Sequence, residues 1–398
     1  MINLTNEQEQ LVQKAVDFYY NSSEQVFQYS GKAGTGKSVV MMAIIERLGL
    51  MMEEVAPMSY IGAAAIVMRT KGLINAKTIH SWLFEPKIIF DYENMDAYVN
   101  RPRKKLVFVP KPLIGKKLIC IDEAGSVPYK LKEEIESRGI KIIACGDLNQ
   151  LPPVADNPAY LYSGKVHILN QIMRQAENSG IVYLANRILD HKPIERGLYG
   201  NAIVINHDEI NDVMLAKCDA VICGKNATRD RFNRHMRKIN NIDPYFNIPK
   251  FGEKLICRKN NWQVSSNGIN LANGLTGMVV NSPSVYGFDG KTFTIDFAPT
   301  MFQSVFKDLK CNYNYFRAAY QDREHIKNTY YEIGEMFELG YAITTHISQG
   351  SQFVNGLYVS EYMHKDINTN LDYTGITRFS NTCVYVLKET GPFRYKHF

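Results

Sequence analysis

A glycine-rich segment near the N-terminus contains the residue types that bind phosphate. Residues 31–38 read Gly-Lys-Ala-Gly-Thr-Gly-Lys-Ser, the complete pattern G-x-x-x-x-G-K-[ST]. Glycines let backbone N–H groups surround an anion, and a following helix adds the positive end of its dipole. We expect Gly34, Thr35 and Gly36 to hold phosphate oxygens, Lys37 to contact the β- and γ-phosphates, and Ser38 to bind Mg²⁺. The segment predicts a nucleoside triphosphate site.

Two further polar segments follow apolar runs. Asp122 and Glu123 come directly after an apolar run, so Asp122 is placed to bind Mg²⁺ and Glu123 to orient and deprotonate an attacking water. Gln150 follows a second such run and could bond the γ-phosphate. A buried strand with a polar cap is the alternative for either segment, and the upstream phosphate loop favours the catalytic interpretation.

The elements that must position these residues repeat a strand, a loop and a helix. Continuous apolar runs are typical of a parallel sheet covered on both faces, in which ligands bind at the carboxyl ends of the strands. The segment from Val39 to Leu48 reads as a helix. The sequence therefore predicts an α/β fold. The expected strands are Val26–Tyr29, Glu54–Ala56, Lys117–Ile121 and Ile140–Cys145 in a first unit, and Ala220–Cys223, Gly356–Val359 and Thr382–Leu387 in a second.

Two stretches interrupt this pattern. Residues 84–112 are dense in proline and charge, and the alternation from Leu106 to Val109 fits one arm of a hairpin. Residues 248–335 are rich in Asn, Gly, Phe and Tyr, with alternation typical of β-structure. We expect a first domain at 1–166, with 84–112 inserted, and a second at 167–398, with a small β-domain at 248–335 inserted.

Composition sets few limits on function. A formal charge of +6 over 398 residues permits a polyanionic partner without requiring one, and the local basic clusters read first as solvated surface. The seven cysteines are dispersed, without zinc spacing, and are expected to be buried thiols. No segment has the apolar length of a membrane span, and the N-terminal residues lack the pattern of a signal peptide, so we expect a cytoplasmic protein.

Ordered motifs along nearly the whole chain resemble those of superfamily 1 helicases, in the branch that contains RecD and the phage helicase Dda. The phosphate loop and Asp122–Gly125 are similar to motifs I and II of that family. The resemblance implies two RecA-like P-loop domains, with a strand-separating pin inserted in the first and an SH3-type β-barrel in the second. The other matching segments are Leu4–Gln8, Ala56–Pro57 with Ala63–Ala64, Thr78–Ser81, Gly146–Val154, Leu169–Gln175, Tyr341–Ser351 and Tyr373–Arg378.

The resemblance assigns roles to residues outside the phosphate loop. It implies that Gln8 reads the adenine, that Gln349 contacts the nucleotide, and that Arg174 and Arg378 face the γ-phosphate from the second domain. Without the motif context, a surface ion pair would be as good an interpretation of either arginine. It also implies contacts with single-stranded DNA, for which the candidate residues are Pro57, Thr78, His80, Thr345, His346 and Ser348.

The function that the resemblance implies is an ATP-dependent DNA helicase that moves 5′ to 3′ and uses Mg²⁺. Its partners would be single-stranded DNA and junctions of single- and double-stranded DNA, with a single-strand-binding or replisome protein as a candidate, and a monomer would suffice. The first alternative is a translocase that needs a partner to unwind duplex, since the expected pin is short. The second is a nucleotide-gated binding module, against which Glu123 and the two arginines argue.

Overall fold

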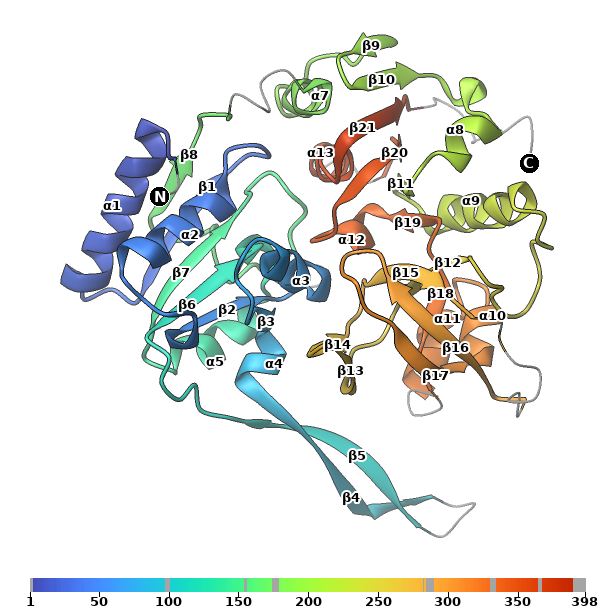
Figure 1. The fold of residues 1–398 in the computed structure, drawn as a ribbon, viewed down its shortest axis with the longest axis horizontal. Coiled ribbons are helices and arrows are strands. Elements are labelled where there is room, and N and C mark those ends of the chain that lie inside the picture. The colour runs from blue at the N-terminus through green and yellow to red at the C-terminus, as the bar shows by residue number, and fades with distance from the viewer. Residues whose placement is uncertain are drawn as a thin grey trace.

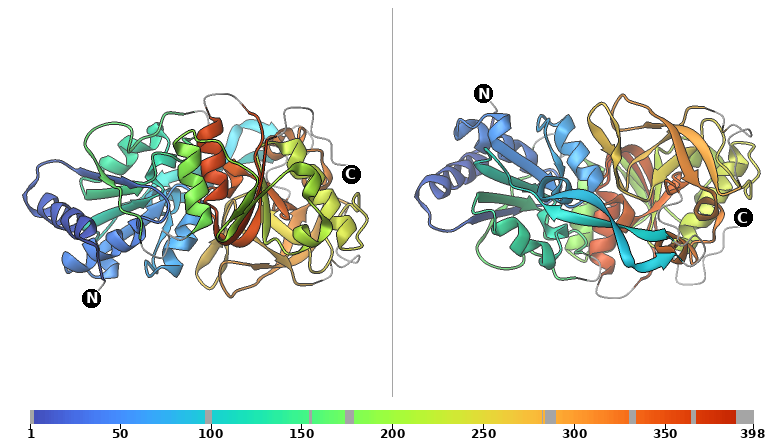
Figure 2. Two further views of the ribbon diagram at one scale, coloured as in Figure 1. Left: turned by 90° about the horizontal axis from the view of Figure 1, so that it is seen from above. Right: turned by 90° about the horizontal axis from the view of Figure 1, so that it is seen from below.

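Two α/β units lie side by side in the computed structural model, as Figure 1 shows. The structure describes residues 3–96, 101–153, 156–173, 179–281, 283, 290–329, 334–363 and 367–388. A β-rich insertion packs against the second unit, and a long hairpin leaves the first unit and extends beneath that insertion (Figure 2). The predicted α/β class with parallel sheets is confirmed.

The first unit is built on a parallel sheet in the order β3-β2-β6-β7-β1-β8. Its central strands are buried along almost their whole length, because helices cover both faces of the sheet. β8 pairs with β1, so the sheet continues past the expected domain boundary at residue 166. The strands are β1 (Val26–Gly31), β2 (Val55–Ser59), β3 (Lys77–Thr78), β6 (Leu118–Asp122), β7 (Lys141–Gly146) and β8 (Val166–Leu169).

The helices of this unit begin where the sequence supplies caps or glycine. Thr5 and Gln8 form a capping box at the start of α1, and Gly36 precedes α2 in a left-handed conformation. The apolar faces of α1 and α2 pack with β1 and β7 in one core. The helices are α1 (Asn6–Asn21), α2 (Lys37–Arg47), α3 (Gly62–Thr70), α4 (Ile79–Leu83) and α5 (Lys132–Glu136).

The second unit repeats the design with the order β19-β11-β20-β21-β10-β9, in which only the β9–β10 pair is antiparallel. Its strands are β9 (Gly197–Tyr199), β10 (Ala202–Ile205), β11 (Ala220–Cys223), β19 (Ala342–Thr344), β20 (Phe353–Val359) and β21 (Phe379–Val386). Its helices are α7 (Gly180–Leu189), α8 (Asp212–Ala216), α9 (Asn226–Ile239), α12 (Thr345–Ser348) and α13 (Asn368–Ile376).

The insertion in the second unit forms an antiparallel sheet in the order β17-β16-β15-β12-β18, beside a separate hairpin. Its core combines aliphatic side chains with buried phenylalanines, among them Phe293, Phe297 and Phe337. The last strand lies just beyond the expected limit at residue 335. The elements are β12 (Lys254–Cys257), the hairpin β13 (Asn261–Ser266) with β14 (Ile269–Leu271), β15 (Thr276–Val279), β16 (Thr292–Pro299), β17 (Phe306–Asn312), α10 (Tyr313–Arg317), α11 (Arg323–Thr329) and β18 (Phe337–Leu339).

The hairpin of the first unit consists of β4 (Phe84–Asp96) and β5 (Arg101–Pro110), which pair antiparallel from Phe84 opposite Pro110 onward. At about 3.3 Å per residue the ribbon is roughly 30 Å long, so it is not the short pin expected from the sequence. All seven cysteines are buried free thiols. Within the described residues, no helix has the length and apolar content that crossing a membrane requires.

Candidate functional site

A cavity of about 610 Å³ lies between the two α/β units. Most of its wall comes from the first unit, from the phosphate loop, α2, α3 and the segments that follow β6 and β7, and strand ends are where ligands bind in parallel sheets. The second unit closes the opposite side. The lining residues are Ala33, Gly34, Gly36, Lys37, Ser38, Val39, Met42, Ala64, Val67, Lys71, Asp122, Glu123, Gln150, Gly350, Ser351, Gln352, Thr377 and Arg378.

The phosphate loop has the backbone that its glycines were expected to allow. Gly34 and Gly36 have φ angles of 85° and 79°, a region that side-chain-bearing residues rarely adopt. The Lys37 ammonium is turned back onto the loop and donates to the carbonyl oxygen of Gly31 at 2.7 Å. With the N-terminus of α2 behind it, this loop is shaped for an anion.

The oxygen donors expected to bind Mg²⁺ both line the cavity. Ser38 supplies a hydroxyl and Asp122 a carboxylate, and oxygen ligands are those that Mg²⁺ prefers. The Lys71 ammonium, at the end of α3, donates to Ser38 Oγ at 3.2 Å. The positively charged Lys71 ammonium therefore lies next to the Ser38 hydroxyl. The Ser38 hydroxyl and the Asp122 carboxylate together fit Mg²⁺.

Glu123 is held in a strained position where the two units meet. Its φ of 51° lies in the left-handed region, and burial raises the pKa of its carboxyl while the Arg378 guanidinium opposes that rise. Arg378 Nη1 lies 3.8 Å from Glu123 Oε1. The Gln150 amide bridges them: its nitrogen can donate to Glu123 Oε2 at 3.2 Å, and its oxygen can accept from Arg378 Nη2 at 3.1 Å. Three predicted catalytic residues are thus brought together.

The tyrosine of α13 joins the second unit to the phosphate loop. Tyr373 is buried, and its hydroxyl donates to Asp147 Oδ2 at 2.5 Å and accepts from the backbone N–H of Ala33 at 2.8 Å. The fully buried hydroxyl has a pKa raised by burial and by the Asp147 charge, so it stays protonated and can act as the donor.

The loop after β7 makes further contacts with the second unit. Thr374 Oγ1 accepts from the backbone N–H of Leu151 at 3.1 Å, and Gln349 Nε2 donates to the Leu151 carbonyl oxygen at 2.8 Å. Asn370 Nδ2 donates to the carbonyl oxygen of Asn149 at 2.9 Å. The residues flanking Gln150 are therefore bonded to two segments of the second unit, α13 and the end of α12.

Three residues expected to bind the nucleotide lie behind or beside the cavity rather than in its wall. Gln8 Nε2 donates to the Thr35 carbonyl oxygen at 2.9 Å and its Oε1 caps α1, so Gln8 supports the loop from behind. Thr35 is fully buried, with Oγ1 donating to the Lys32 carbonyl oxygen. Gln349 makes the contact with Leu151 described above. Their roles toward a nucleotide stay predictions.

Residues of the first unit expected to contact DNA lie around the base of the hairpin. Pro57 is buried in β2, and its carbonyl oxygen accepts from Trp82 Nε1. Thr78 caps α4 and its hydroxyl lies 2.8 Å from that of Ser81. His80 packs near the rings of Phe84 and Phe108, and burial, with a smaller effect of Lys130, lowers its pKa.

The residues of the second unit expected to contact DNA form the short helix α12. Thr345 and Ser348 are fully buried; Thr345 Oγ1 donates to the Cys223 carbonyl oxygen, and Ser348 Oγ donates to that of Thr345. His346 is half-buried, and burial lowers the pKa of its imidazole. Arg174 lies outside the described residues. All these DNA assignments stay predictions.

Several residues of the site had no role assigned from sequence. Lys71 and Thr377 line the cavity, and Tyr373 and Asp147 form its interdomain bond. Tyr373 and Asp147 lie inside segments that match family motifs, so the motifs indicated their neighbourhood and not their contact. Nothing in the sequence around Lys71 distinguished it from a surface lysine.

Both the sequence and the fold of the chain are similar to those of known proteins. A model of the AAA domain family matches residues 3–203. The chain is similar to the crystal structure of Pif1 helicase from Candida albicans, with a TM-score of 0.53, 19% identity, and 97% of this chain and 94% of that chain covered. The Bacteroides Pif1 helicase in complex with ADP-AlF3 and ssDNA gives a TM-score of 0.56 and 17% identity, covering 97% and 92%.

Curated relatives match at somewhat higher identity but are much longer. An uncharacterised protein of Methanocaldococcus jannaschii is 26% identical over 439 residues, 90% of this chain and 36% of that protein. The ATP-dependent DNA helicase RRM3 of Saccharomyces cerevisiae is 31% identical over 170 residues, 38% of this chain and 21% of that protein. The chain thus spans about a third or less of the length of these relatives.

Proposed function

The chain belongs to the AAA domain family, and from this premise we propose that it is an ATP-dependent DNA helicase. The observation that carries the proposal is the meeting of Glu123, from the first unit, with Arg378, from the second, at one cavity. A site divided between two units needs both for hydrolysis. The contacts around the nucleotide therefore couple the chemistry to the distance between the units.

The residues of the cavity have distinct parts in hydrolysis. Lys37 and the loop amides bind the phosphates, and Glu123 takes a proton from the attacking water. Gln150 sits between Glu123 and Arg378 and aligns both. Mg²⁺, held by Ser38, Asp122 and the phosphates, would neutralise charge on the phosphoryl oxygens. Arg378 stabilises the same charge from the opposite unit, a contact worth ~10³–10⁵ in rate in comparable enzymes.

Motion of the units becomes translocation when both hold one DNA strand. Pif1 helicase from Bacteroides, with which this chain shares its fold, has a structure with bound ssDNA. We place the strand along Thr78 and His80 of the first unit and α12 of the second, with His346 as its contact there. Translocation 5′ to 3′ and a place in the RecD and Dda branch, with a phage or bacterial cytoplasmic setting, rest on the motif resemblance alone.

The protruding hairpin is the part of the protein suited to separate strands. Its base lies beside α4 of the first unit and the β13–β14 hairpin, where Trp262 Nε1 donates to Ser81 Oγ of α4 at 3.1 Å and the Trp262 ring lies 5.2 Å from that of Phe108. A hairpin that contacts both units can block the duplex while one of its strands is pulled past the hairpin. This favours a self-sufficient helicase over a translocase that needs a partner to unwind.

ATP hydrolysis with and without single-stranded DNA tests the proposal. We expect DNA to stimulate hydrolysis at least tenfold, and Lys37→Ala to abolish it. Glu123→Gln should reduce the rate by 10²–10⁴-fold while binding of a fluorescent ATP analogue persists, because the base is lost and the phosphate loop is intact. Hydrolysis indifferent to DNA would reject the motor and leave a nucleotide-gated binding module.

A further inference from the structure

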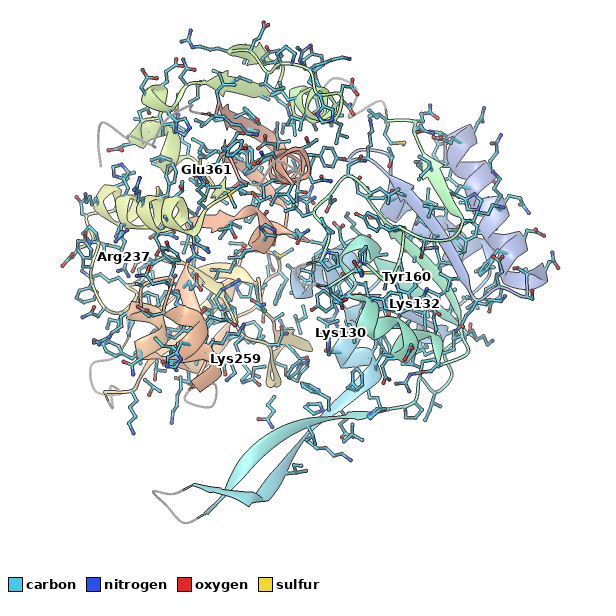
Figure 3. All side chains as sticks on the ribbon, turned by 180° about the vertical axis from the view of Figure 1, so that it is seen from behind. Lys130, Lys132, Tyr160, Arg237, Lys259 and Glu361 are labelled. Carbon is cyan, nitrogen blue, oxygen red and sulfur yellow. The ribbon has the colours of Figure 1, made fainter. Side chains whose placement is uncertain are left out.

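A second cavity, of about 490 Å³, lies on the second unit between α9, the chain that follows it, and the α10–α11 region. It shares no lining residue with the cavity between the units. Figure 3 labels Arg237 of its wall, on the side of the second unit that faces away from the first. Nothing in the proposed helicase cycle uses this place.

Arg237 builds the wall of this cavity. Its side chain is buried beside Glu253, to which Nε and Nη2 donate at 2.8 and 2.9 Å. Nη1 donates to the Phe246 carbonyl oxygen at 2.6 Å, and the guanidinium lies 5.6 Å from the Phe316 ring. One buried ion pair therefore holds the segment after α9 against α10, so the cavity is preformed rather than a gap between loose segments.

The floor of the cavity belongs to an ionic cluster of arginines and carboxylates. Glu338 is buried and lies within 3.2 Å of Arg229, Arg258 and Arg323. Asp230 pairs with Arg229 at 3.1 Å and with Arg323 at 3.6 Å. Of this cluster, Asp230, Arg323 and Glu338 line the cavity, and the positive excess of the lining comes from Arg234 and Arg317 at its rim. Arg323 Nε is buried and makes no hydrogen bond within the described residues, which leaves a donor for a ligand.

The rim of the cavity combines cations with aromatic faces. Arg234 and Arg317 are exposed; the Arg234 guanidinium lies 5.9 Å from the Tyr245 ring, and that of Arg317 lies 5.4 Å from the ring of Tyr313, which is outside the lining. Tyr245 is 74% exposed and Tyr320 38%. Exposed rings beside guanidinium groups can stack on a base while the charges bind its phosphate.

We propose that this cavity binds a nucleotide unit, with its phosphate against Arg234, Arg317 and Arg323 and its base on Tyr245 or Tyr320. The volume accepts one base and sugar, and the positive rim selects an anion. The same chemistry is offered by a free nucleoside monophosphate and by one nucleotide of a single strand. A strand held here would be a second DNA contact, outside the path between the units.

Photo-cross-linking with two probes tests this proposal. The first probe is 5-iodo-2′-deoxyuridine 5′-monophosphate, and the second is a thymidine oligonucleotide that carries 5-iodouracil. Mass spectrometry of the full chain should place cross-links on the peptides containing Tyr245 or Tyr320, and excess inorganic phosphate should reduce them. Reaction with the monophosphate alone identifies a free nucleotide as the ligand. Reaction with the oligonucleotide alone identifies a strand.

Matched variants establish the part of the arginines. Arg234→Gln with Arg317→Gln should lower cross-linking at least tenfold. Lys238→Gln removes the same charge from α9 outside the cavity and should leave it unchanged. Because all three positions are exposed, folding and DNA-stimulated ATP hydrolysis should persist. Cross-links absent from both tyrosine peptides with both probes, or unaffected by the double variant, would overturn the proposal.

Discussion

The Tyr373 hydroxyl lies 2.5 Å from the Asp147 carboxylate, and this bond crosses the cleft between the two α/β units. The same hydroxyl accepts from the backbone N–H of Ala33 in the phosphate loop. Because this buried hydroxyl bonds both a carboxylate and an amide of the phosphate loop, its contacts depend on the nucleotide site and on the closure of the two units. The contact therefore gives the cleft a specific closed arrangement.

Tyr373→Phe should weaken closure by about 1.5–3 kcal/mol, the range for a hydrogen bond to a charged group. We expect KM for ATP to rise by roughly 10- to 150-fold, because the closed form that binds nucleotide is less populated. Steady-state hydrolysis with saturating DNA measures this. Asp147→Asn should give a similar loss, and the double variant should be no worse than either one, since the two residues form one contact.

Tyr162→Phe is the matched control, because its hydroxyl bonds the Leu148 carbonyl oxygen at 3.4 Å without crossing the cleft. This variant should keep the wild-type KM. Fully additive effects of Tyr373→Phe and Asp147→Asn would show that the 2.5 Å contact does not act in closure.

The acid limb of the pH–rate profile should report Glu123. Burial raises the pKa of this carboxyl above its ordinary value of 4.5, so as pH falls the base is protonated and hydrolysis is lost at a pH above that value. Asp147 also raises the pKa of Glu123, and Asp147→Asn should move the limb to lower pH. A limb that stays in place in this variant, or moves to higher pH, would contradict Glu123 as the base.

Shortening the hairpin should abolish duplex unwinding and leave ATP hydrolysis intact. Ile88 pairs with Leu106, so excising residues 89–105 and joining the ends by a two-residue Asn-Gly turn keeps the register and the base. We expect duplex unwinding to be lost and DNA-stimulated hydrolysis to stay within about twofold of wild type, because the cleft is untouched. If the shortened protein still unwinds duplex DNA, the hairpin is not the element that separates the strands.

Trp262→Ala should loosen the hairpin from the inserted β-domain. The variant removes the bond to Ser81 and the edge contact with Phe108, an aromatic pair worth ~0.5–1.5 kcal/mol beyond burial. We expect fewer base pairs opened per ATP hydrolysed, measured by parallel unwinding and phosphate-release assays. Phe251→Ala, on an exposed ring of the same insertion, is the control and should leave this ratio unchanged.

Much of the fold could be predicted because its signals are local. The phosphate loop, the runs that became β1, β6 and β11, and the acidic residues after β6 are defined by neighbours in sequence. Continuous apolar runs specify buried parallel strands without knowledge of their partners. The strands therefore fell within a few residues of their expected limits, and the cavity formed where strand ends were expected to meet.

The remaining features depend on contacts between residues distant in sequence. The bond between Tyr373 and Asp147 spans 226 positions, and neither residue type alone indicates it. The Gln8 amide nitrogen donates to the carbonyl oxygen of Thr35, 27 positions further along the chain. Trp262 contacts Phe108 of the hairpin only because two insertions meet in space. Local sequence patterns carry no information about such contacts between distant residues.

Unwinding of two tailed duplexes tests the central claim most directly. One fluorescent duplex carries a 5′ single-stranded tail and the other a 3′ tail, and Lys37→Ala serves as the blank. We predict ATP-dependent opening of the 5′-tailed duplex, no opening of the 3′-tailed one, and no activity in the variant. Preference for the 3′ tail would contradict the assigned polarity. Failure to open either duplex, with hydrolysis still stimulated by DNA, would contradict a self-sufficient helicase.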